Sequence, residues 1–253
     1  MAYLDRDGVN IYYEDHGKPG DDRTAILLTH GFGASTGMWQ GQIDAFGDRF
    51  RMVAWDMRGH GQSDGPDDLA HYGQDLTVAD MAALLDHLGI DKAIIAGHSL
   101  GGFMSLRFHA THLGRVLGLI LQGTGPGFRN EAAREKWNES ANQRAETIEA
   151  KGFKGGGSEI GKGKRGTPKG LANAARGMLA HVDAKVIDDL PNVAVPSIVI
   201  VGANDTNFLG AAEYMEKKIA GATRIVVPDA GHGCNMDQPE IVNEALDGYL
   251  AAF

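Results

Sequence analysis

Three segments of the chain have the pattern Gly-x-Ser-x-Gly, which presents a nucleophilic serine when it forms a sharp turn between a strand and a helix. The pattern alone is weak, because the chain has 36 Gly in 253 residues. Around Ser99, however, residues 93–96 are apolar and typical of a buried strand, and apolar residues at helical spacing follow. Ser35 and Ser63 follow loop-like sequence instead. The context therefore predicts that Ser99 is the nucleophile.

A serine hydroxyl is a poor nucleophile at neutral pH, so a base must accept its proton. His232 lies in an Ala-Gly-His-Gly segment between the last predicted strand and the last predicted helix, where a flexible backbone lets the imidazole reach the serine. The other histidines considered lie on the serine turn, on its helix, or in loops after earlier strands. We expect His232 to be the general base, although a polar turn residue is the simpler alternative.

A carboxylate is needed to orient the base, and two loops after predicted strands could supply it. Residues 123–127 contain no acidic residue, whereas residues 202–206 offer Asp205 directly after a strand. Asp205 is therefore the predicted acid, with a turn or helix-capping role as the alternative. The resulting chain order is Ser, Asp, His.

Hydrolysis of an acyl group also needs two N–H donors for the oxyanion. The backbone of Leu100, directly after the serine, is expected to supply one. The glycine-containing segment 30–33 is expected to supply the other from Phe32. Met38, Trp39 and His98 are weaker candidates for lining the substrate pocket, since they lie near Phe32 or Ser99 in the sequence. An ordinary role in the core is equally consistent with the aromatic residues.

The elements that position these residues follow from hydrophobic patterning. Strands are predicted at residues 11–13, 25–29, 52–55, 93–96, 117–121, 197–201 and 224–227, and helices at 76–88, 210–219 and 239–250. This alternation predicts the α/β class, with a mostly parallel central sheet flanked by helices. The core domain is expected to comprise residues 1–127 and 191–253.

Residues 128–190 break this alternation and are predicted to form a small helical insertion over the strand ends, which we call the cap. Helical patterns cover residues 131–150 and 171–182. Residues 151–170 between them mix Lys and Arg with glycine, which is typical of a solvated surface loop. A lid that binds an anionic substrate is the sharper alternative for this segment.

The composition of the chain limits the kinds of partner and the location that we expect for it. The net charge of −9 argues against nucleic-acid binding and gives no general attraction to anionic membranes. No apolar run reaches the length of a membrane span, and the N-terminus lacks the pattern of a secretory signal. A single cysteine, Cys234, permits no internal disulfide. A cytoplasmic location is therefore expected, with a small-molecule substrate as the partner; homo-oligomerisation is left open.

Together these motifs resemble the α/β-hydrolase superfamily, in particular its small, capped serine esterases and lactonases. The resemblance covers nearly the whole chain and rests on residues 30–33, on 97–102, on Gly202-x-x-Asp205, on Gly231-His232 and on the Asp-x-Arg-Gly-x-Gly-x-Ser-Asp segment at 56–64. In that superfamily the segment 56–64 is structural, so the resemblance implies no catalytic role for Ser63. The cap resembles nothing that assigns a substrate.

The resemblance implies a carboxylesterase with a catalytic triad and an oxyanion hole, acting through an acyl-enzyme on esters of small to medium acyl chains, and needing no metal or organic cofactor. The fold alone does not choose the substrate. An enol-lactone hydrolase or a carbon–carbon bond hydrolase of aromatic degradation is the first alternative. A ligand receptor without catalytic activity is the second. Haloperoxidase-like side activity is also left open.

Overall fold

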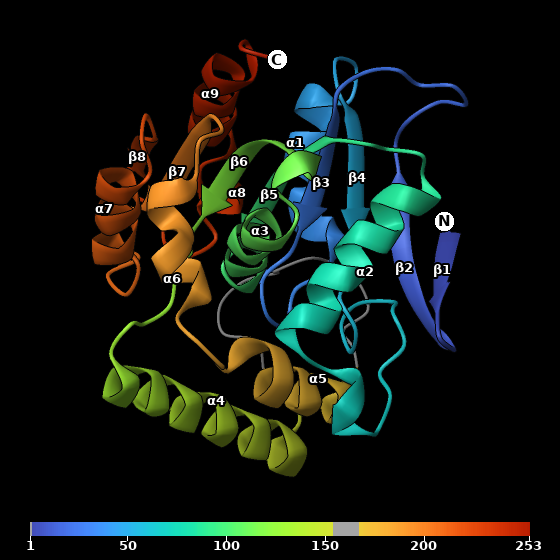
Figure 1. Cartoon of the computed structure of the whole chain (residues 1–253), viewed down its shortest axis with the longest axis vertical. Coiled ribbons are helices and arrows are strands. Elements are labelled where there is room, and N and C mark those ends of the chain that lie inside the picture. Colours follow the sequence, from blue (N-terminus) through green and yellow to red (C-terminus); the bar gives the residue numbers. More distant parts are fainter. Residues whose placement is uncertain (1, 154–166) are drawn as a thin grey trace.

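A central sheet organises the molecule in the computed structural model, which describes residues 2–153 and 167–253 (Figure 1). The described residues form eight strands in the order β1-β2-β4-β3-β5-β6-β7-β8. The bounds are β1 Ala2–Arg6, β2 Val9–Asp15, β3 Ala25–Thr29, β4 Arg51–Trp55, β5 Ala93–His98, β6 Val116–Gln122, β7 Ser197–Gly202 and β8 Thr223–Val227. Pairing is parallel from β4 through β8 and antiparallel at β1–β2 and β2–β4. The predicted α/β class and mostly parallel sheet are confirmed.

Helices cover both faces of this sheet. The bounds are α1 Gln40–Phe46, α2 Gln74–His87, α3 Leu100–Thr111, α7 Leu209–Lys218, α8 Cys234–Asp237 and α9 Pro239–Leu250. Strand β5 shows how the faces separate: Ala93 and Ile95 join one core cluster with α2, α3 and α7, whereas Ile94 and Ala96 join another with α1 and α9. Because both faces of β5 are buried, its sequence is continuously apolar rather than alternating.

The predicted strands are all present, each within one or two residues of its expected bounds. Strand β1, helix α1, helix α8 and the short helix Lys185–Asp189 were not predicted. Strand β1 is a short edge strand in which exposed and half-buried residues alternate, so its sequence carries little apolar signal. Helix α1 spans one amphipathic stretch of only seven residues, which is too short for a periodicity to be recognised.

The cap contains α4 Glu131–Lys151, α5 Pro168–Ala174 and α6 Lys185–Asp189. Helices α4 and α5 lie together at the end of the molecule farthest from the C-terminus (Figure 1). They share a small apolar cluster in which Ala145 and Ile148 pack with Leu171 and Ala175. The predicted helix 171–182 is present in part: α5 runs into a π-helical turn, Ala175–Leu179, and then ends. Most of the predicted Lys/Gly loop, residues 154–166, lies outside the described residues.

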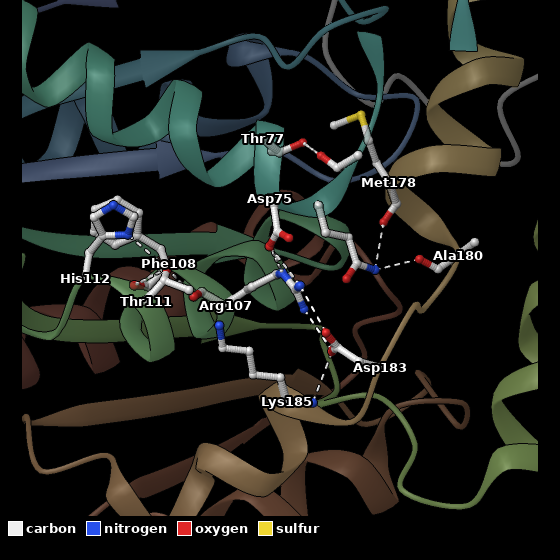
Figure 2. A network of polar contacts seen from close by, with 12 residues as sticks. Asp75, Thr77, Arg107, Phe108, Thr111, His112, Met178, Ala180, Asp183 and Lys185 are labelled. Atoms are coloured by element: carbon white, nitrogen blue, oxygen red, sulfur yellow. Dashed lines mark hydrogen bonds and ion pairs between the residues drawn. The ribbon is translucent and has the colours of Figure 1, made fainter. Parts of the chain in front are cut away.

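The end of the cap is fastened to the core. Arg107 of α3 is buried, and its guanidinium contacts Asp75 of α2 at 2.8 Å and Asp183 of the cap at 3.0 and 3.1 Å. Figure 2 shows these carboxylates converging on the one guanidinium, with the backbone N–H of Lys185 also donating to Asp183. Gln74 donates to the carbonyl of Ala180 beside this cluster. Two helices of the core therefore hold the segment that follows the π-helical turn.

Candidate active site

Ser99 lies in a strained turn between β5 and α3. Its backbone has φ 52° and ψ −114°, a conformation rarely adopted by residues other than glycine. Gly97 and Gly101 permit this turn: a Cβ at Gly97 would lie 2.2 Å from the Gly101 carbonyl, and one at Gly101 would lie 2.2 Å from the Thr29 oxygen. Thr124 donates its hydroxyl to the Ser99 carbonyl at 2.7 Å. The strand, turn and helix expected from the sequence are thus present around the serine.

His232 and Asp205 form a hydrogen-bonded pair. The imidazole Nδ1–H donates to Asp205 Oδ2 at 2.7 Å. Asp205 is buried just after β7, whereas the side chain of His232 is about two-fifths exposed. The ring of Phe208 stacks on His232 at 5.0 Å. Because Nδ1 carries the proton in this pair, Nε2 of a neutral His232 has a free lone pair with which to act as a base.

His98 is hydrogen-bonded to the loop of His232 and is not among the residues that line the cavity. Its Nε2–H donates to the backbone oxygen of His232 at 2.8 Å, and the two rings lie 4.6 Å apart. Burial, reinforced by the neighbouring His232, lowers the pKa of His98 to about 3, so its ring is neutral at physiological pH. The structure does not place His98 among the residues that line the cavity, which corrects that prediction.

The loop 30–33 is also fixed by a neutral histidine. Nδ1–H of His30 donates to the Gly31 oxygen at 2.7 Å, and the Met57 N–H donates to Nε2 at 3.0 Å. Both ring nitrogens are therefore used in the neutral form, and burial lowers the pKa of His30 well below its ordinary value. Phe32 follows in this loop. Leu100 opens α3, where the first N–H groups lack intrahelical partners.

A cavity of about 650 Å³ opens onto Ser99. Its walls come from the start of α3, the loop after β6, the start of α7 and the cap, and they include Leu100, Phe103, Trp137, Arg144 and His181. The cap residues of this wall were not identified from the sequence. No local pattern marks them, because only the folding of α4 and the 180–182 segment over α3 brings them to the serine.

Met38 and Trp39 lie elsewhere. Both are almost completely buried in the core cluster on the α1 and α9 side of the sheet. They are close to Phe32 in sequence, but a 3₁₀ turn, Thr36–Trp39, directs their side chains into that core. The prediction that Met38 and Trp39 line the pocket is wrong, and both are ordinary core residues.

Across 2–153 and 167–253, no group of three His, Cys, Asp or Glu side chains is arranged to hold a metal ion. None of the helices in these ranges has the length and apolar character required to cross a bilayer.

Comparison with known proteins agrees with this fold. The family model described as alpha/beta hydrolase fold matches residues 24–172, which is more than half of the chain. 3-Oxoadipate enol-lactonase 1 of Acinetobacter baylyi is 28% identical, with 91% of this chain and 90% of that protein covered. A non-heme chloroperoxidase of Streptomyces lividans is 29% identical over 96% of this chain and 97% of its own. The solved structure of a thermophilic esterase from Thermogutta terrifontis, with malate bound, superposes with a TM-score of 0.84 at 26% identity, covering 100% and 99% of the two chains.

Proposed function

The chain belongs to the family with the alpha/beta hydrolase fold, and from this premise we propose that it is a serine hydrolase of carboxylic esters with small to medium acyl chains. The observation that carries the proposal is the arrangement of three residues. Ser99 stands in a strained turn at the cavity, His232 is hydrogen-bonded to Asp205 of the loop after β7, and His98, the residue before the serine, donates to the backbone oxygen of His232. A base oriented by a buried carboxylate is what a serine nucleophile requires.

In the proposed reaction, Ser99 Oγ attacks the ester carbonyl carbon while Nε2 of His232 accepts the hydroxyl proton. The carboxylate of Asp205 stabilises the imidazolium formed. The N–H groups of Leu100 and Phe32 donate to the oxygen that becomes negative. His232 then gives its proton to the departing alcohol, leaving an acyl group on Ser99. A water molecule, deprotonated by His232, releases the acid and restores the serine.

The cavity supports the substrate size. A volume of about 650 Å³ is in the middle of the range for small-molecule sites, and most of the wall is apolar. An acyl chain of a few to about ten carbons fits such a space. We also propose that the enzyme acts in the cytoplasm on a free small molecule.

Hydrolysis of an enol-lactone is the second candidate, because an enol-lactonase is among the relatives aligned over nearly the whole chain. A lactone is an internal ester, so the same serine, base and oxyanion donors would open it. The two substrates differ in what remains on the enzyme. A lactone leaves no separate alcohol to depart, because its alcohol stays tethered to the acyl group.

The test is turnover of p-nitrophenyl esters from C2 to C12, an enol-lactone and a ring-cleavage dienoate by the wild type and by Ser99→Ala. We expect strong ester turnover that disappears in Ser99→Ala. A fast lactone or dienoate reaction with weak ester turnover would move the protein to the alternative chemistry. No turnover of any of these substrates would contradict the esterase proposal and favour a ligand receptor.

A further inference from the structure

One charged side chain enters an otherwise neutral cavity wall. Among the described residues that line the cavity, Arg144 is the one with a permanent charge, and no Asp or Glu is present beside it. The remaining polar groups on the wall, such as Ser140 and Asn207, are neutral. The whole chain carries a net charge of −9, so an anionic ligand is disfavoured at long range unless a local cation attracts it.

The charge of Arg144 is available to a ligand. Its guanidinium carbon lies 5.7 Å from the centroid of the Phe32 ring, which places it over the loop expected to supply an oxyanion donor. Within residues 2–153 and 167–253 it forms no ion pair. The nearby cap cations behave differently: Arg176 and Lys169 are both paired with Glu149. The fold thus pairs two cap cations with one carboxylate and leaves Arg144 facing the cavity.

His181 adds a polar ring to the cap side of the cavity wall. Its ring is stacked between Phe103 at 4.4 Å and Trp137 at 5.3 Å and is only 7% exposed. Its Nδ1 is buried without a partner in the described part of the chain. Burial lowers the pKa of His181 to about 4, so the ring is neutral at pH 7 and offers a hydrogen bond without a second charge.

The position of His181 is fixed before any ligand arrives. Its backbone N–H donates to Asn138 Oδ1 at 2.7 Å, and Asn138 Nδ2 donates to its carbonyl at 2.9 Å. Trp137 of α4 also donates to the Leu179 carbonyl. Hydrogen bonds from α4 therefore hold the segment that carries His181. The ring of His181 is therefore held in one place on the cavity wall.

We propose that Arg144 makes this cavity selective for esters that carry a carboxylate, with His181 donating or accepting a hydrogen bond on the same substrate. The inference rests on the proposed esterase function and adds the substrate class to it. A guanidinium presents two parallel N–H donors that match the two oxygens of a carboxylate.

The kinetic test compares two substrates of equal chain length, p-nitrophenyl hemiadipate and p-nitrophenyl hexanoate. We expect Arg144→Gln to lower the ratio of their kcat/KM values, anionic over neutral, about fivefold, a modest effect because Arg144 is exposed to solvent. Arg144→Lys keeps the charge and should keep part of the ratio. Lys136→Gln removes a charge from the same helix outside the cavity and should leave the ratio as it is. An equal effect of Arg144→Gln on both esters overturns the proposal.

A matched pair locates the carboxylate in the substrate: 4-(hexanoyloxy)benzoate and phenyl hexanoate carry the difference on the alcohol side. If Arg144→Gln lowers the ratio of anionic to neutral kcat/KM in that pair alone, the result supports a carboxylate on the leaving group. If Arg144→Gln lowers that ratio only for the hemiadipate and hexanoate pair, the result supports a carboxylate on the acyl group.

A binding measurement separates this inference from the esterase proposal. Calorimetric titration of adipate into Ser99→Ala needs no turnover, and we expect binding that Arg144→Gln weakens about fivefold. If no ester is hydrolysed but this difference appears, the esterase proposal fails and the carboxylate site stands. If esters are hydrolysed but adipate binds Ser99→Ala equally well with and without Arg144→Gln, or binds neither protein, the carboxylate site is wrong and the esterase proposal stands.

Discussion

The imidazole of His98 donates from Nε2 to the backbone oxygen of His232 across 2.8 Å, so the residue before the serine holds the loop that carries the proposed base. His98 is buried and His232 is partly buried, and the structure gives the His232 oxygen no other side-chain donor among the described residues. An unsatisfied buried carbonyl costs about 1–3 kcal/mol. The position of His232 thus depends on a residue that does not reach the substrate.

His98→Leu is therefore expected to lower kcat about tenfold, because a loop displacement of about 1 Å is enough to misplace a catalytic base. KM should change little, since His98 does not line the cavity. His98→Gln retains an N–H donor and should recover part of kcat. Steady-state kinetics of both variants provide the measurement. A rise in KM with unchanged kcat would instead assign His98 to substrate binding.

Ser99→Gly should abolish activity and yet stabilise the protein. The positive φ of Ser99 is unfavourable for any residue with a Cβ, and such strain costs about 1–3 kcal/mol. Glycine relieves it, so we expect the free energy of unfolding of Ser99→Gly to exceed that of Ser99→Ala by about 1 kcal/mol. Urea denaturation of the two variants measures the difference. A less stable glycine variant would show that the turn is not strained.

Asp205→Asn should lower kcat by about 10³–10⁴-fold, the loss expected when the orienting carboxylate of a triad becomes an amide. The variant should fold normally, because asparagine has nearly the same shape. Asp237→Asn is the matched control: its carboxylate accepts the Gly231 N–H at 2.8 Å in the same loop but does not contact the imidazole. A loss of similar size in the control would mean that loop position, not charge, explains both effects.

The stability of the protein should fall as the pH is lowered from about 6.5 to about 4. Burial holds the pKa of His60 and His181 near 4 and that of His98 near 3, and that of His30 lies well below its ordinary value. Between these pH values the histidines are protonated in the unfolded chain but neutral in the folded protein. Acid therefore favours unfolding by about 1.4 kcal/mol per pH unit for each such group. Burial raises the pKa of Asp56 to about 6, so this one carboxyl acts in the opposite direction over the same range.

The four histidines outweigh that single carboxyl. Urea midpoints at pH 7.5, 6.5, 5.5 and 4.5 should therefore decrease steadily with falling pH. A midpoint that stays constant or rises toward pH 4.5 would show that these side chains are protonated in the folded protein.

Arg107→Met should loosen the cap. Hydrogen bonds to a charged group contribute about 1.5–3 kcal/mol, and both partner carboxylates remain accessible to water, so a stability loss of about 2 kcal/mol is expected. KM should rise, because Asp183 is two residues from His181 of the cavity wall. Arg129→Met breaks an exposed pair with Asp188 in the cap and should have little effect. Equal effects of the two variants would argue against a special role for Arg107.

Local sequence was sufficient for the sheet strands and for the turn around Ser99. Residues 93–96 are apolar because β5 is buried on both faces, and the glycines at 97 and 101 are required wherever strand and helix approach so closely. His232 and Asp205 could be selected because each lies in a loop directly after a strand, and parallel strands bring such loops to one edge of the sheet. These inferences depend on chain order and backbone conformation alone, which the sequence determined by itself.

Only the tertiary structure decided which side chains form the pocket. Met38 and Trp39 are near Phe32 in sequence but enter the opposite core, and His98 supports a loop instead of facing the cavity. Arg144 and His181 reach the cavity from the cap without any local signal. The physical reason is that the direction of a side chain depends on how helices pack across the sheet, which involves residues distant in the sequence. Backbone turns are local, whereas the walls of a cavity are assembled from several segments.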